Sequence, residues 1–252
     1  MKPFNSIVIL SHGWTGSSIF AGLLQRAGYW VGTETVKKPE FDTYENARLV
    51  ELNSQLLHTL HPRLRGEDHF SAREVEQIEH DASHLDLQPH RDFVTQCEQE
   101  RFWAWKDPQL TWTVRAWARV ADFSRTAFLT LSRSDLQSWI TLNQRSHVQS
   151  WSFTRRHNQA INRSNQAFAL THGAKHLHLT LEDLLLKPEG TLDRLNDTFG
   201  LYLGMGDLQS VCHLPLYRKR RDWRDFTGAL KNYLKHYHAR DGRGSVLNSE
   251  AA

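Results

Sequence analysis

The chain has 252 residues, of which 39% are hydrophobic and 11% aromatic, and its formal net charge is +3. These values predict one elaborated domain with a sizeable core, and the small positive charge suits an anionic ligand without indicating a nucleic-acid binder. Two cysteines exclude a disulfide framework and a cysteine-based zinc site, and the 15 histidines show no metal-type spacing. Because of this cysteine count and histidine spacing, we expect no metal. No apolar run reaches membrane-spanning length and residues 1–5 leave no room for a signal peptide, so we expect a cytoplasmic protein.

The first predicted unit is a strand, a turn of small residues and a helix. Residues 7–10 form an apolar, β-branched run typical of a buried parallel strand, and apolar residues return at helical spacing from Ser17. Gly13 and Gly16 let the backbone approach a ligand, and no lysine follows Gly16, so the turn is not a Walker A sequence. The pattern favours a phosphate or sulfate site, although an ordinary strand-to-helix turn has the same composition. Hydroxyl donors for such a site are present on Thr15, Ser17 and Ser18.

The chain from this helix to position 100 is predicted to be mostly helical. The first helix is expected to end at Gly28, residues 33–41 form a polar loop, and a helical stripe begins at Asp42 and runs to Leu57. Residues 61–100 are rich in charge and histidine, with helical patches at 71–80 and 92–101. We expect this segment to be a helical insertion or lid with a solvated face.

The second half of the chain repeats the order of strand, polar turn and helix. Residues 126–132 form a core strand that runs into Arg133 and a helix beginning near Leu136. In an open α/β sheet the ends of such strands line one crevice, so Arg133 is expected on the same side as the turn at residues 13–18. Further elements are predicted at residues 151–170 (helix), 174–180 (strand), 181–200 (a turn and an amphipathic helix) and 226–238 (helix), with a disordered tail at 241–252.

Five short motifs, in order over nearly the whole chain, resemble those of the bacterial-type sulfotransferases. They are Trp14–Ser18, Phe41–Asn46 with Leu52-Asn53, Trp105–Leu110, Leu131–Arg133, and Leu181–Leu185 with Lys187–Glu189 and Phe199–Leu201. The resemblance implies a three-layer, P-loop-like α/β fold with a central parallel sheet flanked by helices, in a single domain over residues 1–240. It also implies that 3′-phosphoadenosine-5′-phosphosulfate (PAPS) donates a sulfuryl group to a hydroxyl or amine and leaves as adenosine 3′,5′-bisphosphate (PAP).

The resemblance implies a 5′-phosphosulfate loop over residues 13–19. Its members are Gly13, Trp14, Thr15, Gly16, Ser17, Ser18 and Ile19. Trp14 stands where the family has Arg or Lys, a cation that neutralises charge on the bridging oxygen as the sulfuryl group leaves. Either another cation replaces it, with His12 and Lys106 the nearest in the motifs, or turnover is slow or altered.

The 3′-phosphate site of the family is carried over to Arg133 and to Thr141, a hydroxyl eight residues later, with Ser138 as a nearby substitute. Arg218 and Lys219 resemble the C-terminal Arg-Lys element of the family, although the residue after them is not the family's glycine. The planar guanidinium group suits a phosphate because it can donate two parallel hydrogen bonds.

Sulfuryl transfer requires positioning, charge neutralisation and one group that takes the acceptor's proton. The first candidate for this base is Glu45, since this branch of the family places a carboxylate in that motif, and the second is His12. Glu45 has a solvent-facing or capping role as its structural alternative, and His12 has a packed position under the loop. Lys106 is the third catalytic candidate, with a structural ion pair to Asp107 or Glu182 as its alternative.

The sequence therefore predicts a PAPS-dependent sulfotransferase that acts on a small-molecule or carbohydrate acceptor, without nucleic acid or a membrane span. Because of Trp14, a PAP-binding module that has lost turnover stays open as a second hypothesis. An ATP-dependent P-loop kinase is disfavoured by the missing lysine after Gly16. The sequence identifies neither the acceptor nor the oligomeric state.

Overall fold

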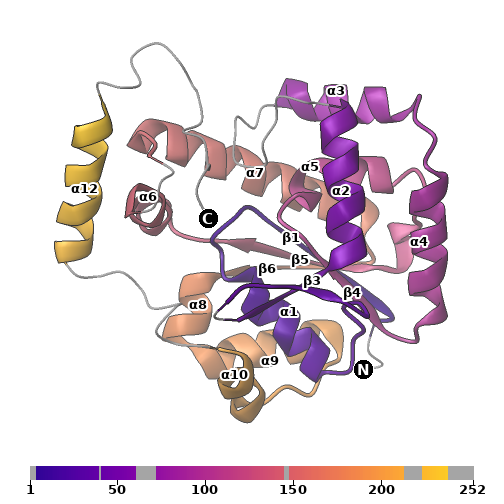
Figure 1. Cartoon of the computed structure of the whole chain (residues 1–252). Coiled ribbons are helices and arrows are strands. Elements are labelled where there is room, and N and C mark those ends of the chain that lie inside the picture. Colours follow the sequence, from indigo (N-terminus) through magenta and orange to yellow (C-terminus); the bar gives the residue numbers. More distant parts are fainter. Residues whose placement is uncertain (1–3, 40, 61–71, 145–147, 213–222, 238–252) are drawn as a thin grey trace.

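The computed structural model describes residues 4–39, 41–60, 72–144, 148–212 and 223–237. Within these ranges a four-stranded parallel sheet has the order β4-β1-β5-β6 (Figure 1). Its strands are β4 (Trp103–Lys106), β1 (Ser6–Ser11), β5 (Ala127–Ser132) and β6 (Lys175–Thr180). An antiparallel hairpin of β2 (Thr35–Lys37) and β3 (Asp42–Asn46) forms a separate small sheet. Because β1 pairs with both β4 and β5, the segment that follows β1 lies between the ends of its two neighbours.

Helices cover both faces of the central sheet (Figure 1). One face carries α1 (Ser17–Arg26), α8 (Leu181–Leu186), α9 (Pro188–Phe199) and α10 (Met205–Val211). The other carries α2 (Ala47–Leu60), α4 (Gln88–Gln99), α5 (Leu110–Trp117) and α7 (Trp151–His172), with α3 (Ala72–Ala82) packed on α5. α6 (Asp135–Gln144) packs against α12 (Trp223–Tyr237). The three-layer α/β fold with a central parallel sheet is thereby confirmed.

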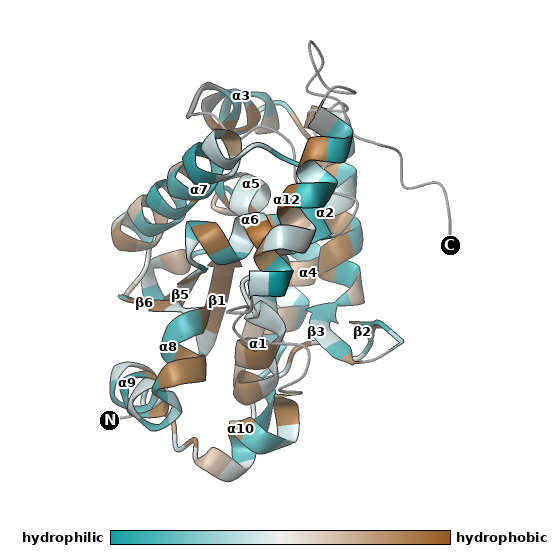
Figure 2. Cartoon of the chain, turned by 90° about the vertical axis from the view of Figure 1, so that its left-hand side faces the viewer, coloured by the Kyte–Doolittle hydropathy of each residue, from teal (hydrophilic) through white to brown (hydrophobic). Residues whose placement is uncertain are grey.

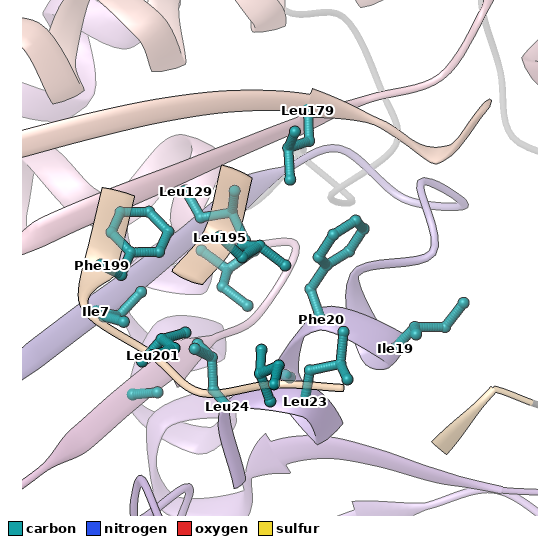
Figure 3. Packing of buried hydrophobic residues seen from close by; sticks show 14 of the residues in the cluster. Ile7, Ile19, Phe20, Leu23, Leu24, Leu129, Leu179, Leu195, Phe199 and Leu201 are labelled. Atoms are coloured by element: carbon teal, nitrogen blue, oxygen red, sulfur yellow. The ribbon is translucent and has the colours of Figure 1, made fainter. Parts of the chain in front are cut away.

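The core on the α1 side of the sheet is mainly aliphatic. Ile7 and Leu129 point to this side because alternate residues of a strand face the same way. Figure 3 shows them in one cluster with Phe20 and Leu23 of α1 and with Phe199 at the end of α9. This cluster fixes α1 against the sheet, and with it the start of the helix beside the end of β1.

The core on the opposite side is rich in aromatic residues. Trp105 and Trp117 are fully buried, with ring centroids 4.8 Å apart, and Phe93 of α4 stacks on Trp105. α4 also buries Val94 and Cys97 in the same cluster. The described part of residues 61–100 is therefore helical and packed onto the domain through buried apolar faces.

The structure corrects the sequence prediction in three places before position 110. Residues 42–46 are strand β3 rather than the first turn of a helix, and α2 begins only at Ala47. The expected loop at 33–41 contains strand β2, and the aromatic segment Trp103–Lys106 is strand β4, which the sequence pattern does not predict. The turn expected from Leu181 is instead the short helix α8, because Thr180 and Asp183 form a capping box there. The other predicted strands and helices within the described ranges are confirmed, with ends shifted by a few residues.

Among the described helices, none combines the length and the apolar character that a membrane crossing requires. Figure 2 shows hydrophilic and hydrophobic residues side by side on α7 and α12, as expected for helices with one packed and one solvated face. The predicted tail at 241–252 lies outside the described residues.

Candidate functional site

The segment that follows β1 is a tight loop with two left-handed residues, Trp14 with φ 68° and Gly16 with φ 75°. A Cβ atom on Gly16 would lie 2.6 Å from Cδ1 of Leu181, so glycine is needed there for space as well as for backbone conformation. The buried Thr15 hydroxyl donates to the His12 carbonyl (3.2 Å). These contacts fix the loop between the ends of β4 and β5.

The first turn of α1 directs backbone donors toward this loop. Gly16 is its N-cap and makes no side-chain capping bond, and the fully described first turn contains no acidic residue. The early N–H groups and the positive end of the helix dipole are therefore suited to an anion, and the Ser17 and Ser18 hydroxyls lie at the same helix start. Gly13 has open space where a Cβ would stand. Ile19 differs from these residues, because its side chain is fully buried in the core and its N–H donates to the Gly16 carbonyl (2.9 Å).

Lys106, the last residue of β4, brings a buried cation to the loop. Its side chain is 4% exposed, and its ammonium group donates to the Glu45 carboxylate and to the Ser18 hydroxyl (3.3 Å). Burial lowers the pKa of Lys106, and the charge of Glu45 opposes that shift. The ion-pair partner is thus Glu45 rather than Asp107 or Glu182. The Glu45–Lys106 ion pair and the Lys106–Ser18 hydrogen bond together join β3, β4 and α1.

Glu45 is positioned by a strained residue that precedes it. Tyr44 has φ 55°, a conformation that is uncommon for a residue with a bulky side chain. Its N–H donates to Oδ1 of Asp42 (2.8 Å), and its ring lies on α1, where a Cβ on Gly22 would be 2.7 Å from Cε2 of the ring. The side chain of Glu45 is 14% exposed. Its carboxylate therefore binds Lys106, and the side chain is partly exposed.

His12 is buried directly after β1. Its Nδ1 lies 2.8 Å from the Gly13 carbonyl, so in the neutral ring Nδ1 is the donor and Nε2 carries the lone pair. Burial lowers the pKa of His12 to about 4; the hydrogen bond to Gly13 opposes this shift, and the charge of Arg133 adds to it. Within the described residues, nothing hydrogen-bonds Nε2. At neutral pH His12 can therefore accept a proton or a hydrogen bond, and it carries no positive charge.

Arg133 approaches the loop from the side of β5. Its Nη1 donates to the Trp14 carbonyl (3.2 Å). The next residue, Ser134, donates its N–H to both oxygens of Glu182 (3.3 Å each), and Asp183 completes the capping box of α8. The acidic pair of α8 therefore anchors the turn that carries Arg133, as well as the start of its own helix.

α6, which begins two residues after Arg133, carries two buried hydroxyl groups. Ser138 and Thr141 are three residues apart, so they share a helix face. Their side chains are 2% and 3% exposed, and no described residue hydrogen-bonds either hydroxyl oxygen. Buried hydroxyls in folded proteins are normally hydrogen-bonded, so both are available to a ligand.

A buried polar network supports the end of β4. Asn53 of α2 donates to Oδ2 of Asp107 (2.7 Å) and accepts from the Thr113 hydroxyl and from Nε1 of Trp117 (2.7 Å each). Burial raises the pKa of Asp107 to about 6, and its hydrogen bonds oppose that shift. The sequence signal for this network is a polar residue, Asn53, on the apolar face of a predicted helix.

The structure thus brings the loop, Glu45, His12, Lys106 and Arg133 to one end of the sheet. Arg218 and Lys219 lie outside the described residues. Sequence reasoning missed Lys38, whose ammonium group lies 5.6 Å from the ring centroid of Trp14, because nothing distinguishes one lysine in a polar segment. Among the described residues, no group of three or more His, Cys, Asp or Glu side chains is arranged to hold a metal ion.

Comparison with known proteins gives similarity in structure but not in sequence. No family model matches the chain, and no curated protein matches it significantly. The chain is similar to the sulfotransferase domain from the curacin biosynthetic pathway, with a TM-score of 0.47, 14% identity, and coverage of 99% of this chain and 95% of that one. It is also similar to retinol dehydratase in complex with androsterone and the inactive cofactor PAP (TM-score 0.38, 10% identity, 98% and 83% covered) and in complex with retinol and PAP (0.38, 11%, 99% and 73%). At these values no residue of the site is assigned from the likeness.

Proposed function

We propose that this protein is a sulfotransferase that moves the sulfuryl group of PAPS to a hydroxyl or amine of a small-molecule or carbohydrate acceptor. One observation carries the proposal: the N-terminus of α1, Lys106 and Arg133 converge on the segment between β1 and α1, residues 12–16. This place, at the ends of adjacent parallel strands, is where ligands bind in open α/β sheets. Its N–H donors and the Arg133 guanidinium group suit a ligand with several negative charges.

The two ends of the donor are assigned to different parts of this site. The 5′-phosphosulfate is proposed to lie on the loop and the first turn of α1. The 3′-phosphate is proposed to contact Arg133, Ser138 and Thr141, with Arg218 and Lys219 as further ligands. In support, the hydroxyls of α6 are buried donors with no partner among the described residues, on the helix that follows Arg133.

The reaction that fits these groups is a direct displacement. The acceptor oxygen or nitrogen forms a bond to sulfur while the bond from sulfur to the bridging oxygen of the 5′-phosphate breaks, and PAP leaves with that electron pair. Glu45 takes the acceptor's proton, because its side chain is partly exposed and its carboxylate binds the same Lys106 that contacts Ser18. Lys106 holds Glu45 in place and donates toward the loop through Ser18. His12 Nε2 is the alternative proton acceptor.

Transfer of labelled sulfate from PAPS to a panel of phenols, sugars and amines tests the proposal. We expect transfer by the native protein and a loss of at least about 100-fold in Arg133→Ala, since a buried charge-assisted contact is removed. The matched control is Arg119→Ala, which removes an exposed guanidinium group after α5. Transfer that survives Arg133→Ala undiminished would contradict the 3′-phosphate assignment.

A second candidate function is a PAP-binding module without turnover. Trp14 favours it, because it occupies the position of the family's basic residue, and so does the neutralisation of Lys106 by Glu45. PAP binding combined with no transfer to any acceptor of the panel would support this alternative.

A further inference from the structure

The 5′ end of the proposed donor site has a deficit of positive charge. Lys106 is neutralised by Glu45, and His12 is neutral near pH 7. Arg133 binds the Trp14 carbonyl and is proposed to hold the opposite end of the donor. A phosphosulfate group carries negative charge that increases on the bridging oxygen as the sulfuryl group leaves. A further cation is therefore needed next to the loop.

Lys38 is a cation held beside this loop by aromatic rings. Its ammonium nitrogen lies 5.6 Å from the ring centroid of Trp14 and 5.8 Å from that of Phe41. Both distances are within the range of cation–π attraction, which aromatic faces exert on ammonium groups. Trp14, which stands at the position of the cation in the family that the sequence resembles, thus contacts Lys38 from another part of the chain.

The backbone around Lys38 is fixed. Lys38 donates its N–H to the Phe41 carbonyl (2.9 Å) and accepts from the Phe41 N–H (3.3 Å), so the two residues close the turn between β2 and β3. The Thr35 hydroxyl donates to Asp42 (2.7 Å) and the Thr43 hydroxyl to the Val36 carbonyl (2.6 Å), which join the strands. The hairpin packs on α1 through β3 (Figure 2). The stem of Lys38 therefore starts from a defined position.

The charge of Lys38 is available to a ligand. The side chain is exposed, and within the described residues no carboxylate lies within 4.0 Å of its ammonium group. The charge of Lys38 also acts on Lys106, because its repulsion adds to the burial that lowers the pKa of Lys106. The neighbouring Lys37 is equally exposed, but no aromatic contact to the loop is formed by it among the described residues.

We propose that Lys38, seated on Trp14, supplies the cation for the 5′-phosphate of the donor in place of a basic residue in the loop. This inference rests on the proposed function, because it assumes that the donor's 5′ end lies on the loop. Lys38 is then a binding and charge-neutralising residue that the hairpin delivers to the site from outside the loop.

The affinities of PAP and of adenosine 3′-monophosphate, measured by titration calorimetry, test this inference without an acceptor. The second nucleotide lacks the 5′-phosphate, so it reports on the 3′ site alone. We expect Lys38→Gln to weaken PAP binding about tenfold and to leave adenosine 3′-monophosphate unchanged, while the control Lys37→Gln changes neither by more than about twofold. Lys38→Arg is expected to retain most of the PAP affinity.

A second variant separates loss of charge from damage to the hairpin. In Trp14→Lys combined with Lys38→Gln, the cation returns to the loop itself, and PAP affinity is expected to recover. If the native protein binds PAP but Lys38→Gln behaves like Lys37→Gln, the role of Lys38 is overturned and the proposed function stands. If the native protein binds neither nucleotide, the proposed function is overturned together with this inference.

Discussion

The contact between Glu45 and Lys106 has two possible purposes, catalysis and folding, which one substitution distinguishes. If Glu45 is the base, Glu45→Gln lowers the rate of sulfuryl transfer by about 100-fold to 10,000-fold and leaves PAP affinity within about twofold. The control is Glu51→Gln, which removes an exposed carboxylate that binds Arg48 and Gln55 on the surface of α2. A variant that unfolds more easily in urea but keeps the native transfer rate in its folded form would show that the pair is only structural.

His12 and Asp107 affect stability in opposite directions over the same pH range. The folded pKa of His12 is about 4, below its ordinary 6.5, so the unfolded chain binds the extra proton and stability falls as pH decreases from 6.5 to 4. The folded pKa of Asp107 is about 6, above its ordinary 3.8, so the folded chain binds the extra proton and stability falls as pH rises from 3.8 to 6. Each group changes the free energy of unfolding by about 3 kcal/mol over its range. Because the two changes have opposite signs, they leave little net pH dependence between pH 4 and 6.

Substituting either residue alone should therefore make the free energy of unfolding depend on pH, although in the native protein the two contributions offset each other. In His12→Asn, the free energy of unfolding should decrease relative to the native protein's as pH rises from 4 to 6, because Asp107 then acts alone. In Asp107→Asn it should increase over the same interval. Urea unfolding at half-unit pH steps measures both. Profiles that both run parallel to the native one would refute the assigned pKa shifts.

At the scale of elements, the approach of β3 to α1 depends on Gly22. A Cβ there would meet Cε2 of Tyr44 at 2.7 Å and Cβ of Val211 at 3.1 Å. Gly22→Ala should therefore destabilise the fold by about 1–2 kcal/mol despite the better helix propensity of alanine, and should slow transfer because Glu45 follows Tyr44. Gly190→Ala in α9 is the control, since no atom lies within 4 Å of its added Cβ, and it should stabilise by about 0.5–1 kcal/mol. Equal stability of the two variants, measured by urea unfolding, would contradict the packing argument.

The elements also show where sequence patterns are sufficient. β1 and β5 are apolar runs followed by turns and periodic helices, so their type was predictable from residue pattern alone. β3 was not, because its five residues continue the helical spacing of α2 and owe their strand form to pairing with β2 and to the strained Tyr44. One available signal is Asn46, whose Oδ1 accepts the N–H of Arg48 (3.0 Å) and so marks the true helix start.

The site was also predictable only in part, because some of its contacts join segments that are distant in the sequence and leave no local pattern. Residues carried by the loop and by the strand ends could be placed, because the parallel topology brings such ends together. The Glu45–Lys106 pair and the seat of Lys38 on Trp14 depend on how the β2–β3 hairpin lies on α1, which is a tertiary contact without a periodic signal. The support of Asp107 by Asn53 likewise joins helices distant in sequence.

At the scale of the whole molecule, β1 lies inside the sheet and its loop is bordered by the ends of β4 and β5. The aliphatic core holds α1 against one face of the sheet and the aromatic core holds α2 against the other, so the proposed anion site is assembled by the fold rather than by one segment. Donor binding should therefore stabilise the entire domain, because every part of the site is lost on unfolding.

The most direct test of the account is the thermal unfolding midpoint with and without PAP, compared with ATP plus Mg²⁺. At a hundred times its dissociation constant, PAP should stabilise the folded state by about 2.7 kcal/mol, which raises the midpoint of a chain of this size by roughly 5–10 °C. We expect such a rise with PAP, a smaller one in Arg133→Ala, and little change with ATP and Mg²⁺. No rise with PAP, or a larger rise with ATP and Mg²⁺, would contradict it.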